Sequence, residues 1–125
     1  MLEYKIIESR LKNINIDFVL LPKEPVEIEA DVNAIMKVPG DKNINRVLFE
    51  ITFKATEKKQ ISEFIVAGGE VVVEFNEKPD YDKVSQGEYP TIAMKELVKK
   101  IDDVIADMNF MQLSFSNNDE TQLNN

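Results

Sequence analysis

Residues 46–75 have the sequence RVLFEITFKATEKKQISEFIVAGGEVVVEF, and this stretch decides the fold. In its first half, apolar side chains fall at every second position, at Val47, Phe49, Ile51, Phe53 and Ala55. Such alternation predicts a strand with one buried face and one solvated face. The second half resumes after the polar connection 56–60 and carries apolar residues on both faces. We therefore expect a second strand that needs cover on both sides.

Two adjacent glycines, Gly68 and Gly69, interrupt this second apolar run before Val71, Val73 and Phe75 resume it. Paired glycines inside a strand pattern predict a bulge or a sharp bend. They do not form a phosphate-binding loop, because neither a helix start nor a Lys-Ser/Thr pair follows them.

Two more strands are expected upstream. Residues 4–18 settle into alternation and predict a first strand, bent near Lys12-Asn13. Residues 26–38 alternate most regularly, and the turn residues 39–43 join them to the next strand as an antiparallel hairpin. The apolar crossover between these strands, residues 19–25, either tucks under the core or offers an apolar surface to a partner.

Helical spacing begins after residues 76–88, which are expected to form a polar loop. From Pro90 to Asn109, apolar residues recur at three- and four-residue steps, which predicts a helix about 30 Å long docked on the sheet. A short extended piece, residues 110–115, follows it. We expect one domain over residues 1–115 and a polar, disordered tail over 116–125.

The resulting order is β-β-β-β-α. It predicts an α+β fold: a four-stranded antiparallel sheet, whose first strand is joined by the crossover loop to a three-strand meander, followed by one long C-terminal helix. One helix cannot cover both faces of this sheet. The second face is therefore either acidic and solvated or closed by another subunit. Its acidic residues form either a solvated outer face or a docking face for a basic partner; they are Glu27, Glu29, Asp31 and Glu50.

Composition excludes several classes of function. The 125 residues carry a net charge of −8 with an isoelectric point near 4.6, which argues against nucleic acid as a partner. The chain has no Cys and no His, so it lacks a thiolate, a disulfide and the usual zinc ligands. Without a convergent nucleophile and base, we expect no enzyme, no metal and no cofactor.

No apolar run approaches the roughly 20 residues that a membrane-spanning helix needs. The N-terminal residues MLEYKIIESR show no signal-peptide pattern. We therefore expect a cytoplasmic protein that does not insert into a membrane.

Local motifs in the right order carry a resemblance to a known family. Residues 12–17, KNINID, with Pro22 downstream, correspond to a first strand of the type Lys-Asp-Ile-Ser-Phe-Glu that leads into a proline. Residues 26–31, VEIEAD, correspond to a second strand of the type Val-Lys-Leu-Asp-Leu-Asp. Residues 62–68, SEFIVAG, match a Cys-Glu-Val-x-x-x-Gly core in a fourth strand.

The helix has matching ends. Tyr89-Pro90 stands where an aromatic-proline pair precedes the helix, and residues 110–115, FMQLSF, stand where Phe-Pro-x-Leu-x-Leu ends it. With these motifs, residues 10–115 resemble the SecB family of export chaperones.

The resemblance implies a cytoplasmic homo-oligomer, a dimer or a dimer of dimers (a homotetramer). Its implied activity is that of an ATP-independent holdase, which binds exposed hydrophobic segments of unfolded proteins or preproteins, prevents aggregation and aids protein export. An alternative is an adaptor module of the same fold for one specific partner, such as the control of a toxin–antitoxin pair. The client-binding residues implied by position are Val19, Leu20, Leu21, Val26 and Ile28.

The family also uses an acidic sheet face to engage the basic end of the translocase motor SecA. Carried across by position, that partner-docking patch is Asn13, Asp17, Ile61 and Glu63. Asn13 stands where the family has an acid, and the sequence after residue 115 is polar where bacterial members continue into a further helix. The resemblance leaves open the natural clients, the delivery partner and the choice between dimer and tetramer.

Overall fold

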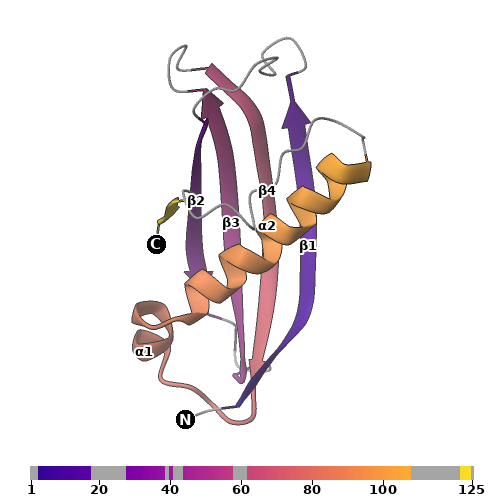
Figure 1. The fold of residues 1–125 in the computed structure, drawn as a ribbon. Helices are drawn as coiled ribbons and strands as arrows, with labels where there is room; N and C mark the ends of the chain where they lie inside the picture. The colour runs from indigo at the N-terminus through magenta and orange to yellow at the C-terminus, as the bar shows by residue number, and fades with distance from the viewer. Residues whose placement is uncertain are drawn as a thin grey trace.

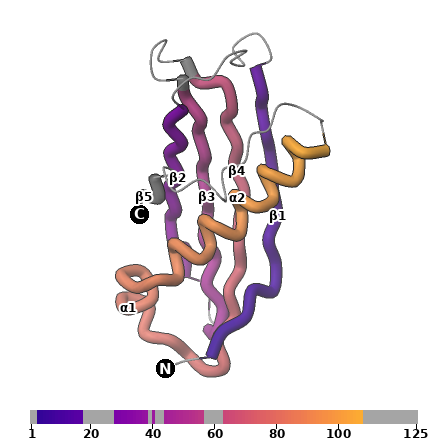
Figure 2. Tube along the Cα trace, in the orientation of Figure 1, coloured from indigo at the N-terminus to yellow at the C-terminus, as the bar shows by residue number. Residues whose placement is uncertain are grey.

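The computed structural model describes residues 3–17, 28–38, 40, 44–57, 62–107 and 122–124. A five-stranded sheet of order β1-β4-β3-β2-β5 is crossed diagonally on one face by the long helix α2 (Figures 1 and 2). The elements are β1 (Tyr4–Ile16), β2 (Ile28–Lys37), β3 (Arg46–Glu57), β4 (Ser62–Phe75), α1 (Tyr81–Gln86), α2 (Tyr89–Asp107) and β5 (Gln122–Asn124).

The four long strands pair antiparallel, with β1 beside β4 and the meander β2-β3-β4 completing the set. This arrangement and the helix that follows it confirm the predicted α+β fold. Since β1 and β2 lie on opposite sides of the β4-β3 pair, the chain crosses the sheet between them. Most of that crossover, residues 18–27, lies outside the described residues.

The core lies between α2 and one face of the sheet. Val32 of β2, Phe53 of β3 and Ala67 of β4 lie opposite one another, and all three are buried. From the helix, the buried side chains are Pro90, Ala93, Met94, Leu97, Val98, Ile101 and Ile105, which follow the predicted helical periodicity. Because β3 alternates strictly, its odd-numbered residues from 47 to 55 are all buried on this face.

The apolar residues on both faces of β4 are accommodated in part by a bulge. Ala55 pairs with Ile65 and Thr56 with Glu63, so Phe64 has no partner in β3. Phe64 and Ile65 are each 1% exposed, because two residues opposite one let neighbouring side chains enter the same core.

The predicted bend near Lys12-Asn13 is present as a register shift between Leu11 and Asn13 in β1. The bulge expected in β4 at the glycine pair is instead in β1, directly opposite Gly68 and Gly69. Gly69 serves a close approach: a Cβ there would lie 2.3 Å from the carbonyl oxygen of Arg10 and 2.6 Å from Cδ1 of Leu97.

Two segments differ from expectation. Within the expected loop 76–88, α1 forms over six residues, capped by the Asp80 carboxylate, which accepts a hydrogen bond of 3.1 Å from the Asp82 amide. Part of the tail, which we expected to be disordered throughout, forms the strand β5. Residues 108–115 of the predicted helix end and extended piece lie outside the described residues. Neither helix among the described residues is long and apolar enough to span a bilayer.

Candidate functional site

Of the five predicted client-binding residues, the structure places one. Ile28 is the first residue of β2, opposite Glu57 of β3, and is half-buried at the margin of the core on the helix-covered face. Val19, Leu20, Leu21 and Val26 lie outside the described residues. The role of the whole set stays a prediction.

A small apolar cavity of about 100 Å³ opens on this same face, near the other end of β2. Its lining comes from both layers of the fold and consists of Ala34, Met36, Phe49, Ser85 and Pro90. The Ser85 hydroxyl donates a hydrogen bond of 2.9 Å to the Asp82 carbonyl, so its polar group is satisfied within α1. The remaining walls are apolar, and the space suits about one aliphatic side chain.

Sequence reasoning missed this cavity because it did not expect α1. The helix has a single buried residue, Val84, and its two apolar positions, Tyr81 and Val84, are too few to give a periodic signal. The signal that was present is the pair of Asp80 as N-cap and Gly87 after the last turn, which is typical of a short helix.

The strand β2 has a main-chain edge that faces away from β3. Along this edge, β5 pairs in parallel with residues 31–33, and no described strand pairs with residues 34–37. The nearby side chains Ile35 and Val38 are 62% and 50% exposed. An edge of this kind presents unpaired amide and carbonyl groups that can pair with another extended chain.

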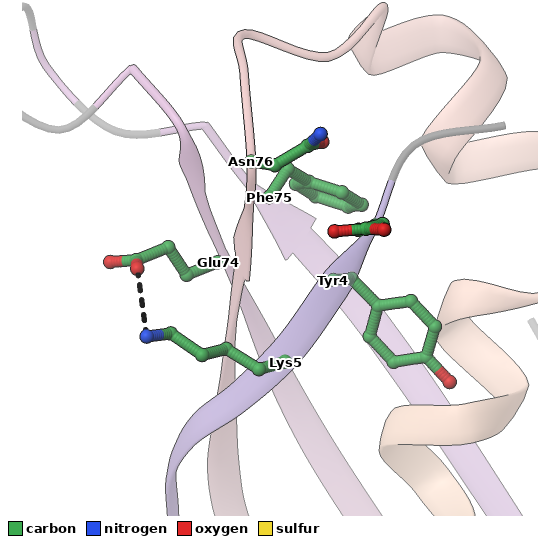
Figure 3. Close-up of a pocket in the computed structure, with 6 residues that line it drawn as sticks. Tyr4, Lys5, Glu74, Phe75 and Asn76 are labelled. Carbon is green, nitrogen blue, oxygen red and sulfur yellow. Dashed lines mark ion pairs between the residues drawn. The ribbon is translucent and has the colours of Figure 1, made fainter.

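A second cavity, of about 250 Å³, lies at the end of the sheet where β1 begins and β4 ends (Figure 3). Tyr4 and Lys5 project to opposite sides of β1, so Lys5 reaches Glu74 at 3.5 Å while Tyr4 turns toward the helical layer. The Tyr4 ring meets the Tyr89 ring edge-on at 5.3 Å, and Tyr89 meets Phe75 at 5.0 Å. This cavity holds an ion pair and packed aromatic rings, without a nucleophile placed beside a base.

The sheet face away from α2 carries ion pairs, and all but one of them, Arg10–Glu8 within β1, join neighbouring strands. Among the described residues, six basic side chains pair with five glutamates; the pairs are Lys5–Glu74, Arg46–Glu74, Arg10–Glu8, Arg10–Glu70, Lys12–Glu70, Lys37–Glu50 and Lys54–Glu63. This face is therefore of mixed charge, which differs from the acidic, solvated face that was one of the two expectations for it. The cause is register, which sets a base on one strand beside an acid on the next.

Two of these pairs shift the titration of their carboxylates. The hydrogen bond from Arg46 Nε, at 2.9 Å, holds the pKa of Glu74 below its ordinary value of 4.5. The hydrogen bond from Lys37 Nζ, at 2.7 Å, likewise lowers the pKa of Glu50. Both acids are therefore fully ionised at neutral pH and compensated by their partners.

Two of the predicted partner-docking residues, Asn13 and Glu63, lie on this mixed-charge face, and a third, Asp17, directly follows the end of β1. The Asn13 amide lies over Gly68, the Asp17 backbone amide donates a hydrogen bond of 2.8 Å to the Phe64 carbonyl, and Glu63 lies 3.5 Å from Lys54. The fold thus brings positions from β1 and the start of β4 to one end of the sheet. Ile61 lies outside the described residues.

A four-stranded antiparallel sheet of this order, with one long helix across a single face, defines a SecB-like α+β fold. No family model matches the sequence, and no curated protein matches it. Among solved structures, the Mycobacterium tuberculosis Rv1957 SecB-like chaperone, in complex with a ChAD peptide from the Rv1956 HigA1 antitoxin, has a similar fold. The TM-score is 0.61 at 10% sequence identity, over 89% of this chain and 84% of that chain. At this identity the likeness shows the fold.

Proposed function

We propose that this protein is a SecB-like holdase, which binds extended apolar segments of non-native polypeptides without nucleotide. The observation that carries the proposal is the apolar cavity beside an open stretch of the β2 edge, on a fold shared with a peptide-binding chaperone. The cavity takes one side chain of a client at a time, and the extended chain runs along the strand. Reversible binding follows because each side-chain site contributes little alone.

The proposal includes self-association in the cytoplasm. Four apolar residues of the edge strand β1, namely Ile6, Leu11, Ile14 and Ile16, are only partly buried against the core. A second copy placed against this edge would cover them and would pair the outer main chain of β1, beside which no described strand lies. Delivery to an export motor through Asn13, Asp17, Ile61 and Glu63 belongs to the same proposal, as do the client contacts of Val19, Leu20, Leu21 and Val26.

An aggregation assay tests the holdase. A chemically unfolded model substrate is diluted into buffer with and without stoichiometric protein, and light scattering is followed. Scattering should fall in proportion to added protein. Unchanged scattering would refute the proposal.

A matched pair of variants locates the client site. Ile28→Arg adds a charge on the helix-covered face of β2, and Ile44→Arg adds the same charge at an exposed apolar position outside β2. We expect Ile28→Arg to weaken client capture and Ile44→Arg to leave it intact, with circular dichroism confirming that both variants fold. Equal capture by both variants would remove Ile28 from the site.

The second candidate is an adaptor for one specific partner, and the antitoxin peptide bound by the similar chaperone favours it. Such an adaptor would hold one segment much more tightly than all others. A panel of unrelated unfolded clients separates the two functions: comparable affinities support a holdase, and one dominant client supports an adaptor.

A further inference from the structure

We propose that the outer edge of β2 is a strand acceptor for extended polypeptide, and that residues 122–124 of the chain compete for this edge in cis. The proposal rests on the proposed function for the nature of the incoming chain. The mode of binding, main-chain pairing under competition from the protein's own tail, goes beyond it. The competing occupant is visible in Figure 1, where β5 lies beside β2.

The first step is the pairing itself. Gln122, Leu123 and Asn124 lie opposite Asp31, Val32 and Asn33 in parallel register. The edge therefore accepts an extended chain in this structure, and it does so through main-chain groups, which are the same in every sequence. Main-chain pairing is suited to a site that must accept unrelated segments.

The second step is that the tail is a weak occupant. It pairs over three residues, whereas β2 pairs with β3 over its full ten. Asn is among the residues depleted in strands, and the tail segment contains no β-branched or aromatic side chain. A longer, β-prone segment makes more main-chain bonds and displaces it.

The third step is the position of the apolar cavity. Pairing by β5 stops at Asn33, and the next residues of β2, Ala34 and Met36, line the cavity. A segment that extends past Asn33 pairs with residues 34–37 of β2, whose outer edge no described strand covers. Its side chains then lie beside the cavity. The tail thus occupies the main-chain part of the site and leaves the side-chain part open.

The test uses a labelled seven-residue peptide, Lys-Val-Thr-Val-Thr-Val-Lys, and a second peptide in which alternate amides are N-methylated. Methylation removes main-chain donors and keeps every side chain. Fluorescence anisotropy should show binding of the first peptide and loss of binding for the second. Equal binding of both peptides, or binding of neither, would overturn the strand acceptor.

Competition by the tail is tested in the full-length chain with Leu123→Pro, since proline lacks an amide donor and is disfavoured inside a paired strand, and with Leu123→Val, which keeps the amide. A tail docked for about half to nine-tenths of the time raises the apparent Kd about two- to tenfold. Leu123→Pro should therefore bind the peptide about two- to tenfold more tightly, and Leu123→Val should match the wild type. An unchanged Kd in Leu123→Pro would refute the competition.

Amide hydrogen exchange supplies a readout that needs no ligand. In Leu123→Pro, the amides of residues 31–33 that face away from β3 should exchange faster, while those of β4 stay protected. Unaltered exchange at residues 31–33 would show that β5 does not cover this edge in solution. If the peptides behave as expected and aggregation is not suppressed, the holdase fails and the strand acceptor stands. If aggregation is suppressed and both peptides bind equally, the holdase stands and the strand acceptor fails.

Discussion

Gly69→Ala tests how closely α2 and β1 approach β4. The added methyl would lie 2.3 Å from the Arg10 carbonyl oxygen, which is 0.7 Å short of the 3.0 Å that real contacts rarely undercut. It would also lie 2.6 Å from Cδ1 of Leu97. The Leu97 contact can relax by a change of rotamer, but the Arg10 contact is to main chain within the β1–β4 pairing and relaxes only if the strands move apart.

Overpacking of this kind typically costs about 1–3 kcal/mol of the free energy of unfolding. For a domain of this length, each kcal/mol corresponds to roughly 3–5 °C, so the melting temperature should fall by about 3–15 °C. Gly40→Ala is the matched control, because nothing lies within 4 Å of the methyl it adds. Its effect should be a stabilisation of no more than about 1 kcal/mol.

Urea unfolding followed by circular dichroism measures both variants, with the slope m checked for constancy. The double variant Gly69→Ala/Leu97→Ala separates the two contacts. If Leu97 carries most of the overlap, the double variant should be more stable than the sum of the single effects predicts. If Gly69→Ala and Gly40→Ala have the same stability within about 0.5 kcal/mol, the close approach described at Gly69 is wrong.

Three further outcomes are expected. Replacement of Arg46 by Met should raise the pKa of Glu74, measured by carboxyl NMR, and leave Glu50 unchanged, because each acid has its own donor. In the wild type, the contribution of Glu74 to the free energy of unfolding is present above pH 4.5 and is lost as the pH falls through the lower pKa of the folded state. Because the variant lacks the Arg46 donor, its free energy of unfolding should depend less on pH in this range. Ile101→Ala should cost about 2–5 kcal/mol in urea unfolding, whereas the same change at Ile35, which is 62% exposed, should cost less than about 1 kcal/mol; equal costs would contradict the burial of Ile101.

The elements that could be predicted from sequence are those with long, regular patterns. The alternation from Val47 to Ala55 and the helical spacing from Met94 to Ile105 each provide at least five apolar positions in one period, and both elements formed as expected. The six residues of α1 provide two apolar positions, and the three residues of β5 provide one. Elements this short are stabilised by contacts made elsewhere in the fold, which no local pattern records.

The candidate site was less predictable for a related reason. The apolar cavity joins Ala34 and Met36 to Phe49, Ser85 and Pro90, and its walls come from four separate elements. Only the helix-facing alternation of β2 was visible in the sequence. The open edge of β2 depends on strand order, which the sequence pattern does not give. If the crossover placed β2 between two long strands, both of its edges would be paired.

Net charge was a poor guide to the mixed-charge face of the sheet. A chain of net charge −8 predicts acidic surfaces in general, but the antiparallel register sets Lys37 beside Glu50 and Lys54 beside Glu63. A basic partner that docks at Glu63 must therefore compete with Lys54, which is already in place at high effective concentration. Since exposed ion pairs of this kind contribute only about 0–1 kcal/mol, the competition is easily reversed by a partner with several positive charges. Docking on this face would then depend on the number of charges that the partner offers, and it would weaken steeply as salt is added.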